Sequence, residues 1–149
     1  MIVKITWPEI YPVWRTKLWP TRVSDIEPTS CMMFMGGFEQ QNLNQTPVFL
    51  GCMINSQIVG VNSGHLCTDG GFRSRGLWVD PEYRKQGIGV QLLTATIQMA
   101  QHQGAKFCWS LPRHSSWNVY ERAGFTLASN WFPTETSEEN AYCVKHLVK

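Results

Sequence analysis

The twelve residues from Val79 to Val90 constrain the fold more than any other part of the chain. An apolar strand runs into a proline-started turn, two cations, two glycines one residue apart, and then a helix. Gly87 and Gly89 carry no Cβ, so the backbone can approach a ligand closely. The helix that follows directs its unpaired N–H groups and the positive end of its dipole to the same place. With the charges of Arg84 and Lys85, the segment predicts a receptor for a diphosphate.

Two better-known glycine motifs are excluded. The dinucleotide fingerprint needs a glycine or alanine three residues after the second glycine, and Leu92 stands there. A Walker loop ends in Gly-Lys-Ser or Gly-Lys-Thr, and the chain has neither triplet. The plainer alternative is a glycine-softened turn between a strand and a helix, with a solvated Arg-Lys pair.

Two spaced motifs carry a resemblance to a known family. The pattern R-x-x-G-x-G from Arg84 to Gly89 resembles the acyl-CoA pyrophosphate motif of the GCN5-related N-acetyltransferases. Downstream, Tyr120-Glu121-Arg122-Ala123-Gly124-Phe125 resembles the family's Y-E-x-x-G-F segment, where Gly124 stops a helix before the next strand. The strong match covers about Leu77 to Trp131 and a weaker one reaches back to Val48. The first forty or so residues match no motif of the family.

The resemblance implies acetyl-CoA as the acyl donor and assigns roles to the matching positions. The glycine loop would hold the pyrophosphate, and the strand before it, through a bulge, would pair with pantetheine and face an N–H toward the thioester carbonyl. Tyr120 would act as general acid for the departing thiolate, although a tyrosine here can also simply pack its ring. Trp78 has strand packing as its alternative. The implied cofactor contacts are Leu77, Trp78, Val79, Arg84, Lys85, Gln86, Gly87, Ile88, Gly89 and Val90.

The general base is not evident from the sequence. Many relatives place a glutamate on the strand before the glycine loop, but here Arg73 and Arg75 occupy that strand. Either water carries the proton away, or His65 or Asp69 takes it, since histidine has a suitable pKa. A lone histidine on a strand is more often structural. Arg113 stands where many relatives have an asparagine, which puts the usual pantetheine contact there in doubt.

Periodicity predicts one α/β (mixed α+β) domain over residues 1–149. Strands are expected at 2–6, 48–54, 57–66, 72–79, 106–111, 126–132 and 142–148, and helices at 8–18, near Ile26, at 87–103 and at 115–122. Thr6 and Ser115 are candidate helix caps. The order β-α-(loop)-β-β-β-α-β-α-β-β, as in the family, predicts a mixed, mostly antiparallel twisted sheet of about six to seven strands with helices on both faces.

Composition excludes several classes. With 13 basic and 11 acidic side chains the net charge is +2, so no strong field attracts nucleic acid, although Arg113, Arg122, Lys145 and Lys149 keep that alternative in view. No apolar run predicts a membrane span or a signal peptide. Five scattered cysteines indicate reduced thiols in a cytoplasmic protein. His65 and Cys67 make only a weak metal pair, and no metal is expected.

These observations predict an N-acetyltransferase that moves an acetyl group directly to a primary amine of a small molecule or peptide. The alternative is a binding module that holds acyl-CoA without turnover. An aromatic wall (Trp7, Trp14, Trp19, Phe34) facing acids (Glu135, Glu138, Glu139) would suit a cationic amine, but it can equally be core beneath a solvated loop. Arg73, Arg75 and Arg113 would suit an acidic acceptor instead. The acceptor, the acyl length and homodimer formation stay open.

Overall fold

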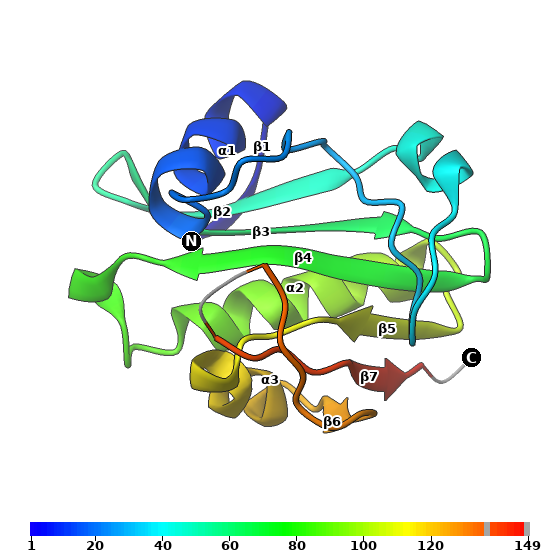
Figure 1. The fold of residues 1–149 in the computed structure, drawn as a ribbon. Coiled ribbons are helices and arrows are strands. Elements are labelled where there is room, and N and C mark those ends of the chain that lie inside the picture. The colour runs from blue at the N-terminus through cyan, green and yellow to red at the C-terminus, as the bar shows by residue number, and fades with distance from the viewer. Residues whose placement is uncertain (136–137, 148–149) are drawn as a thin grey trace.

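A single seven-stranded sheet forms the centre of the protein (Figure 1). The structure is a computed structural model that describes residues 1–135 and 138–147. The strand order is β1-β2-β3-β4-β5-β7-β6, and every neighbouring pair is antiparallel except β4 and β5. The mixed, mostly antiparallel α/β fold is therefore confirmed. The strands are β1 Ile2–Ile5, β2 Val48–Ile54, β3 Gln57–Leu66, β4 Gly71–Val79, β5 Phe107–Ser110, β6 Thr126–Leu127 and β7 Cys143–His146.

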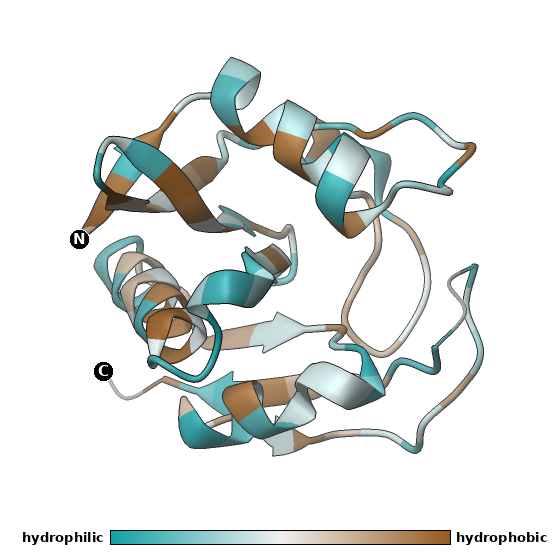
Figure 2. Cartoon of the chain, turned by 90° about the vertical axis from the view of Figure 1, so that its left-hand side faces the viewer, coloured by the Kyte–Doolittle hydropathy of each residue, from teal (hydrophilic) through white to brown (hydrophobic). Residues whose placement is uncertain are grey.

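Helices cover both faces of this sheet. Helix α1, Trp7–Val13, lies in front of the sheet in Figure 1, and α2, Ile88–His102, lies behind it, as the turned view in Figure 2 also shows. The short helix α3, Trp117–Arg122, shares a buried cluster with α2. A π-helical segment, Trp14–Leu18, follows α1 directly. Short 3₁₀ turns lie at Gln40–Asn44, Pro81–Tyr83 and His114–Ser116. Within the described ranges, no helix is both long and apolar enough to cross a membrane.

The local sequence explains the two main helices. Before α1, the N–H and the hydroxyl of Thr6 both bond the Glu9 carboxylate, at 2.8 and 3.0 Å, which secures the first turn as the sequence predicts. In α2, the residues at helical spacing are buried against the sheet: Leu92, Leu93, Thr96, Ile97 and Ala100.

Three local expectations were wrong. No helix forms near Ile26, because Glu27 precedes Pro28 and that position disfavours helical backbone. The strand expected at 126–132 ends at Leu127, because the Ser129 hydroxyl, not a backbone carbonyl, accepts the Tyr142 N–H at 2.9 Å.

Ser115 does not cap α3 either. Its hydroxyl donates to the Glu138 carboxylate at 2.9 Å, and Ser116 holds the N-cap position. The last predicted strand was to end at Val148, which lies outside the described residues.

The tryptophans near the N-terminus are core residues. Trp14 is fully buried, and Trp7, Trp19 and Phe49 each lie within ring-contact distance of it. The three tryptophans of the predicted aromatic wall therefore form the packing between the first helix and the sheet, and Phe34 packs apart from them on β5.

Candidate active site

Among the described residues, the second half of β4 has a free edge, because no strand pairs with it on the β5 side. Strand β5 pairs with residues 71–73 of β4 and then ends at Ser110, whose hydroxyl donates to the Ser74 carbonyl at 2.7 Å. Beyond that bridge β4 continues to Val79 without β5 beside it (Figure 1). An extended ligand can pair with the backbone on this side of residues 75–79, except at the Gly76 and Val79 carbonyls, which accept the Trp14 indole N–H and the Arg84 Nε–H.

The same half of β4 carries a bulge. Val61 pairs with Trp78 and Ser63 with Arg75, so Gly76 and Leu77 together lie opposite Asn62. Gly76 has φ +81°, which a glycine adopts without steric cost. The Trp14 indole N–H donates to the Gly76 carbonyl at 2.9 Å, and a Cβ at Gly76 would lie 2.4 Å from the Trp14 ring. Trp14 therefore holds the bulge in place.

The loop after β4 presents backbone N–H groups. Asp80 accepts the Glu82 N–H at 3.0 Å, and the Arg84 Nε donates back to the Val79 carbonyl at 3.0 Å. The first intrahelical bond of α2 runs from the Gln91 N–H to the Gly87 carbonyl, so the three N–H groups before it are left without an intrahelical acceptor.

Glycine is required at two positions of this loop for different reasons. Gly87 has φ +81°, with no atom within 4 Å of where a Cβ would lie, so its backbone conformation requires glycine. At Gly89 a Cβ would lie 2.8 Å from Val119 Cγ1 of α3, so close helix packing also requires glycine there. The loop is a good anion receptor, with Lys85 also at positive φ, 64°.

Residues that the resemblance implied as pantetheine contacts divide between the two faces. The Leu77 and Val79 side chains pack on the α2 side, whereas the Trp78 ring packs in the cluster beneath α1. Their backbone groups therefore stay the expected points of contact for an extended ligand along the free edge of β4.

Tyr120 lies on α3 within the core cluster beneath α2, 4 % exposed, with its ring edge-on to Phe125 at 5.6 Å. Burial raises its pKa above the ordinary value, and a hydrogen bond with the Ser110 side chain acts in the opposite sense. The phenol is therefore neutral across the physiological range. It can donate a hydrogen bond or proton to a charge that develops beside it.

His65 is enclosed and both its ring nitrogens are occupied. The Ser30 N–H donates to Nε2 at 3.2 Å and Nδ1 lies 3.0 Å from the Leu66 carbonyl, which indicates a proton on Nδ1. Burial lowers the pKa of His65 to about 4. With no lone pair free, its role as a base stays a prediction without geometric support. Asp69 accepts the Gly71 N–H at 2.9 Å in a turn.

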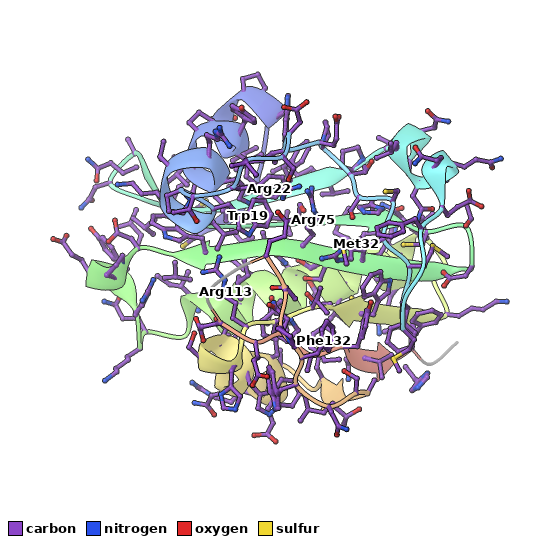
Figure 3. All side chains as sticks on the ribbon, viewed as in Figure 1. Trp19, Arg22, Met32, Arg75, Arg113 and Phe132 are labelled. Atoms are coloured by element: carbon purple, nitrogen blue, oxygen red, sulfur yellow. The ribbon has the colours of Figure 1, made fainter. Side chains whose placement is uncertain are left out.

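A pocket of about 280 Å³ opens on the α1 face of the sheet. Figure 3 shows Trp19, Arg22 and Arg75 together in front of β3 and β4. The lining includes Arg22, Asp25, Glu27, Ser30, Met32, Phe38, Arg75 and Glu135. Most of these residues come from the irregular segment 21–47, where no pattern identified them. Three carboxylates, Asp25, Glu27 and Glu135, line this pocket from loops, whereas β4 carries none.

The other residues proposed for recognition have structural contacts. Arg113 donates to the Leu18 carbonyl at 2.7 Å and so links the turn after β5 to the end of the first helix. Glu138 accepts the Ser115 N–H, which holds the pKa of its carboxyl below the ordinary value. Lys149, one of the four cations considered for nucleic acid, lies outside the described residues.

A buried polar network behind β4 was also missed. Asn62 Nδ2 donates to the hydroxyls of Ser74 and Thr96, both at 2.9 Å, and thereby links β3, β4 and α2. Its Oδ1 is buried without a partner. The polar residues that interrupt two apolar strands were the available signal. Among the described residues, no three acidic, histidine or cysteine side chains gather as metal ligands.

Comparison with known proteins gives the family. The profile of the acetyltransferase (GNAT) family matches residues 6–125. The [Ribosomal protein bS18]-alanine N-acetyltransferase of Escherichia coli K12 is 35% identical over 69 residues, 42% of this chain and 47% of that relative. The chain thus matches about half the length of that curated relative.

Two solved structures share the fold. A GNAT-family acetyltransferase from Staphylococcus aureus Mu50 has TM-score 0.69 and 18% identity, covering 99% of both chains. A Bacillus subtilis acetyltransferase in complex with CoA has TM-score 0.58 and 15% identity, covering 68% of this chain and 78% of its own. Because the profile spans most of the chain, this protein belongs to the acetyltransferase (GNAT) family.

Proposed function

We propose that the protein is an acetyl-CoA-dependent N-acetyltransferase whose acceptor is a primary amine on a small molecule or peptide. The observation that carries the proposal is the continuity of the donor side. An unpaired, bulged edge of β4 leads directly into Gly87 and the free N–H groups of α2. Pantetheine pairs with the edge, and the pyrophosphate accepts hydrogen bonds from the loop Arg84 to Val90.

In the proposed reaction, the amine attacks the thioester carbonyl directly, without an acyl-enzyme intermediate. A backbone N–H at the bulge stabilises the negative charge on the carbonyl oxygen. Tyr120 donates a hydrogen bond to the departing thiolate, which needs a neutral phenol. Carboxylates in the α1-face pocket, Asp25, Glu27 and Glu135, or water accept the proton that the amine loses.

The relative from Escherichia coli is described as acting on an alanine of a ribosomal protein, which supports a peptide amine as one acceptor class. A binding module that holds acyl-CoA without turnover is the alternative. A net charge of +2 does not support a nucleic-acid-binding function.

The test is calorimetry with acetyl-CoA, followed by an assay of free thiol release with a broad panel of amines. We expect saturable binding and amine-dependent thiol release. Binding without release from any amine would favour the binding module, and no binding by folded protein would end the assignment. Protein with Gly87→Ala, in which we expect weaker acetyl-CoA binding, tests whether the binding takes place at the donor loop.

A further inference from the structure

On the basis of the proposed acetyl transfer, we infer that the acceptor carries a carboxylate beside its amine and that Arg75 binds this carboxylate. The binding place is the α1-face pocket. Arg75 lines it and directly precedes Gly76, the bulge residue of the proposed donor side. At about 280 Å³ the pocket holds a small molecule or the end of a peptide.

The Arg75 guanidinium lies between two tryptophan rings and a backbone carbonyl. Its central carbon lies 5.0 Å from the Trp14 ring and 5.3 Å from the Trp19 ring. Nη1 donates to the Glu27 carbonyl at 2.7 Å, and no acceptor in the described part of the chain bonds Nε or Nη2. A fixed, planar fork with spare donors matches the geometry of a carboxylate.

The arginines around Arg75 are close to carboxylates but not directly paired with them in the described part of the chain. Arg73 is 7 % exposed, its Nε has no partner, and its Nη1 lies at a long 3.4 Å from the Ser30 hydroxyl. Arg22 stacks on Trp19 at 5.1 Å. Within residues 1–135 and 138–147, none of these guanidiniums forms an ion pair with a carboxylate. Buried cations without anions are costly, so a ligand anion would stabilise this cluster.

Arg75 stays charged under working conditions. Burial, and then the neighbouring Arg73 and Arg22, lower its pKa to about 9, which leaves it cationic at neutral pH. Ionisation of the arginine therefore does not compete with ligand binding.

The acids of the pocket decide which anion fits. Asp25, Glu27 and Glu135 line the same pocket and are exposed, whereas Arg75 is 5 % exposed. Exposed carboxylates repel a dianion such as a phosphate monoester but attract an ammonium group. A buried cation with acids around it thus fits a molecule with both an amine and a carboxylate, such as an amino acid or an acidic peptide end.

The experiment compares free L-amino acids with their primary amides, which differ only at the carboxylate. Thiol release from acetyl-CoA gives KM and kcat for each pair, and calorimetry gives the affinity of each probe for CoA-saturated protein. We expect the acids to be preferred. Arg75→Gln should raise the KM for the acids and weaken their affinity, each about 10- to 100-fold, because charged hydrogen bonds are lost. The KM and affinity for the amides, and the affinity for acetyl-CoA, should not change.

Two further variants keep the test decisive. Arg122→Gln, an exposed arginine on α3, is the matched control and should behave as wild type. If Arg75→Gln does not fold, Arg22→Gln should raise the KM and weaken the affinity for the acids in the same direction, with a smaller change. Amides that bind and react as well as acids would overturn the carboxylate site. Acids that bind selectively without any thiol release would overturn the transferase function and leave the carboxylate site standing.

Discussion

Replacing Gly76 with alanine tests whether Trp14 and the β4 bulge form one rigid unit. Alanine at φ +81° costs about 1–2 kcal/mol of backbone energy. The new Cβ would lie 2.4–2.5 Å from three atoms of the fully buried Trp14 indole, and such overpacking costs about 1–3 kcal/mol. Displacing the ring also weakens its bond to the Gly76 carbonyl, worth about 0.5–1.5 kcal/mol. We expect the free energy of unfolding to fall by about 3–6 kcal/mol.

Gly104→Ala is the matched control. Gly104 has φ +77°, but no atom lies within 4 Å of where its Cβ would be. It should lose about 1–2 kcal/mol from backbone strain alone. Both substitutions restrict the unfolded chain equally, so the difference between them isolates the contact with Trp14.

Urea unfolding of the two variants and the wild type at neutral pH measures this difference, provided the m-values agree. Gly76→Ala should also lose more acetyl transfer than its loss of stability explains, measured at a temperature where it is fully folded. If the two variants differ by less than about 1 kcal/mol, the indole yields easily and Trp14 does not hold the bulge.

Three more predictions concern single side chains. Tyr120→Phe should lower kcat about 100-fold with unchanged acetyl-CoA affinity in calorimetry, while Tyr11→Phe on the exposed side of α1 serves as control; wild-type turnover would remove the role. His65 has a pKa of about 4 in the folded protein and about 6.5 in the unfolded chain, so below pH 6.5 the unfolded chain binds the extra proton first. The free energy of unfolding should therefore fall by about 3 kcal/mol between pH 7 and pH 4. In urea unfolding, His65→Gln should reduce that slope, and an unchanged slope would contradict the linkage. Gly87→Ala should weaken acetyl-CoA binding about 10-fold in calorimetry, whereas Gly104→Ala should not; equal affinities would contradict the loop geometry.

The local geometry of the proposed donor side was predictable, because neighbouring residues encode it. The positive φ of Gly87, the helix start after it and the strand before it are all set by neighbouring residues. The hairpin of β2 and β3 was predicted with correct bounds for the same reason, since alternation and a two-residue turn specify it. Nothing in the local pattern, however, indicates that close packing with Val119, thirty residues further along the chain, requires glycine at position 89.

The acceptor side was not predictable because it is assembled from distant segments without regular structure. Arg22 and Glu27 come from a loop with no periodicity, and they meet Arg75 only in the fold. No acidic residue on β4 marks a base, and the carboxylates of the α1-face pocket are on loops, where no sequence pattern identifies them. His65 was a predicted base because an ordinary histidine pKa lies near neutrality, but burial lowers its pKa to about 4.

The bulge connects these two sides. Gly76 lies in the bulge and its carbonyl accepts the Trp14 indole N–H, while Arg75 beside it lines the α1-face pocket and lies over the same indole. One buried indole thus fixes the proposed carbonyl-binding backbone and the proposed carboxylate-binding guanidinium relative to each other. Such a shared support gives the reacting amine a defined approach, because orientation contributes several kcal/mol to bimolecular catalysis. Substitutions at Trp14 should therefore affect acceptor KM and kcat together, whereas substitutions at Arg75 should act mainly on KM.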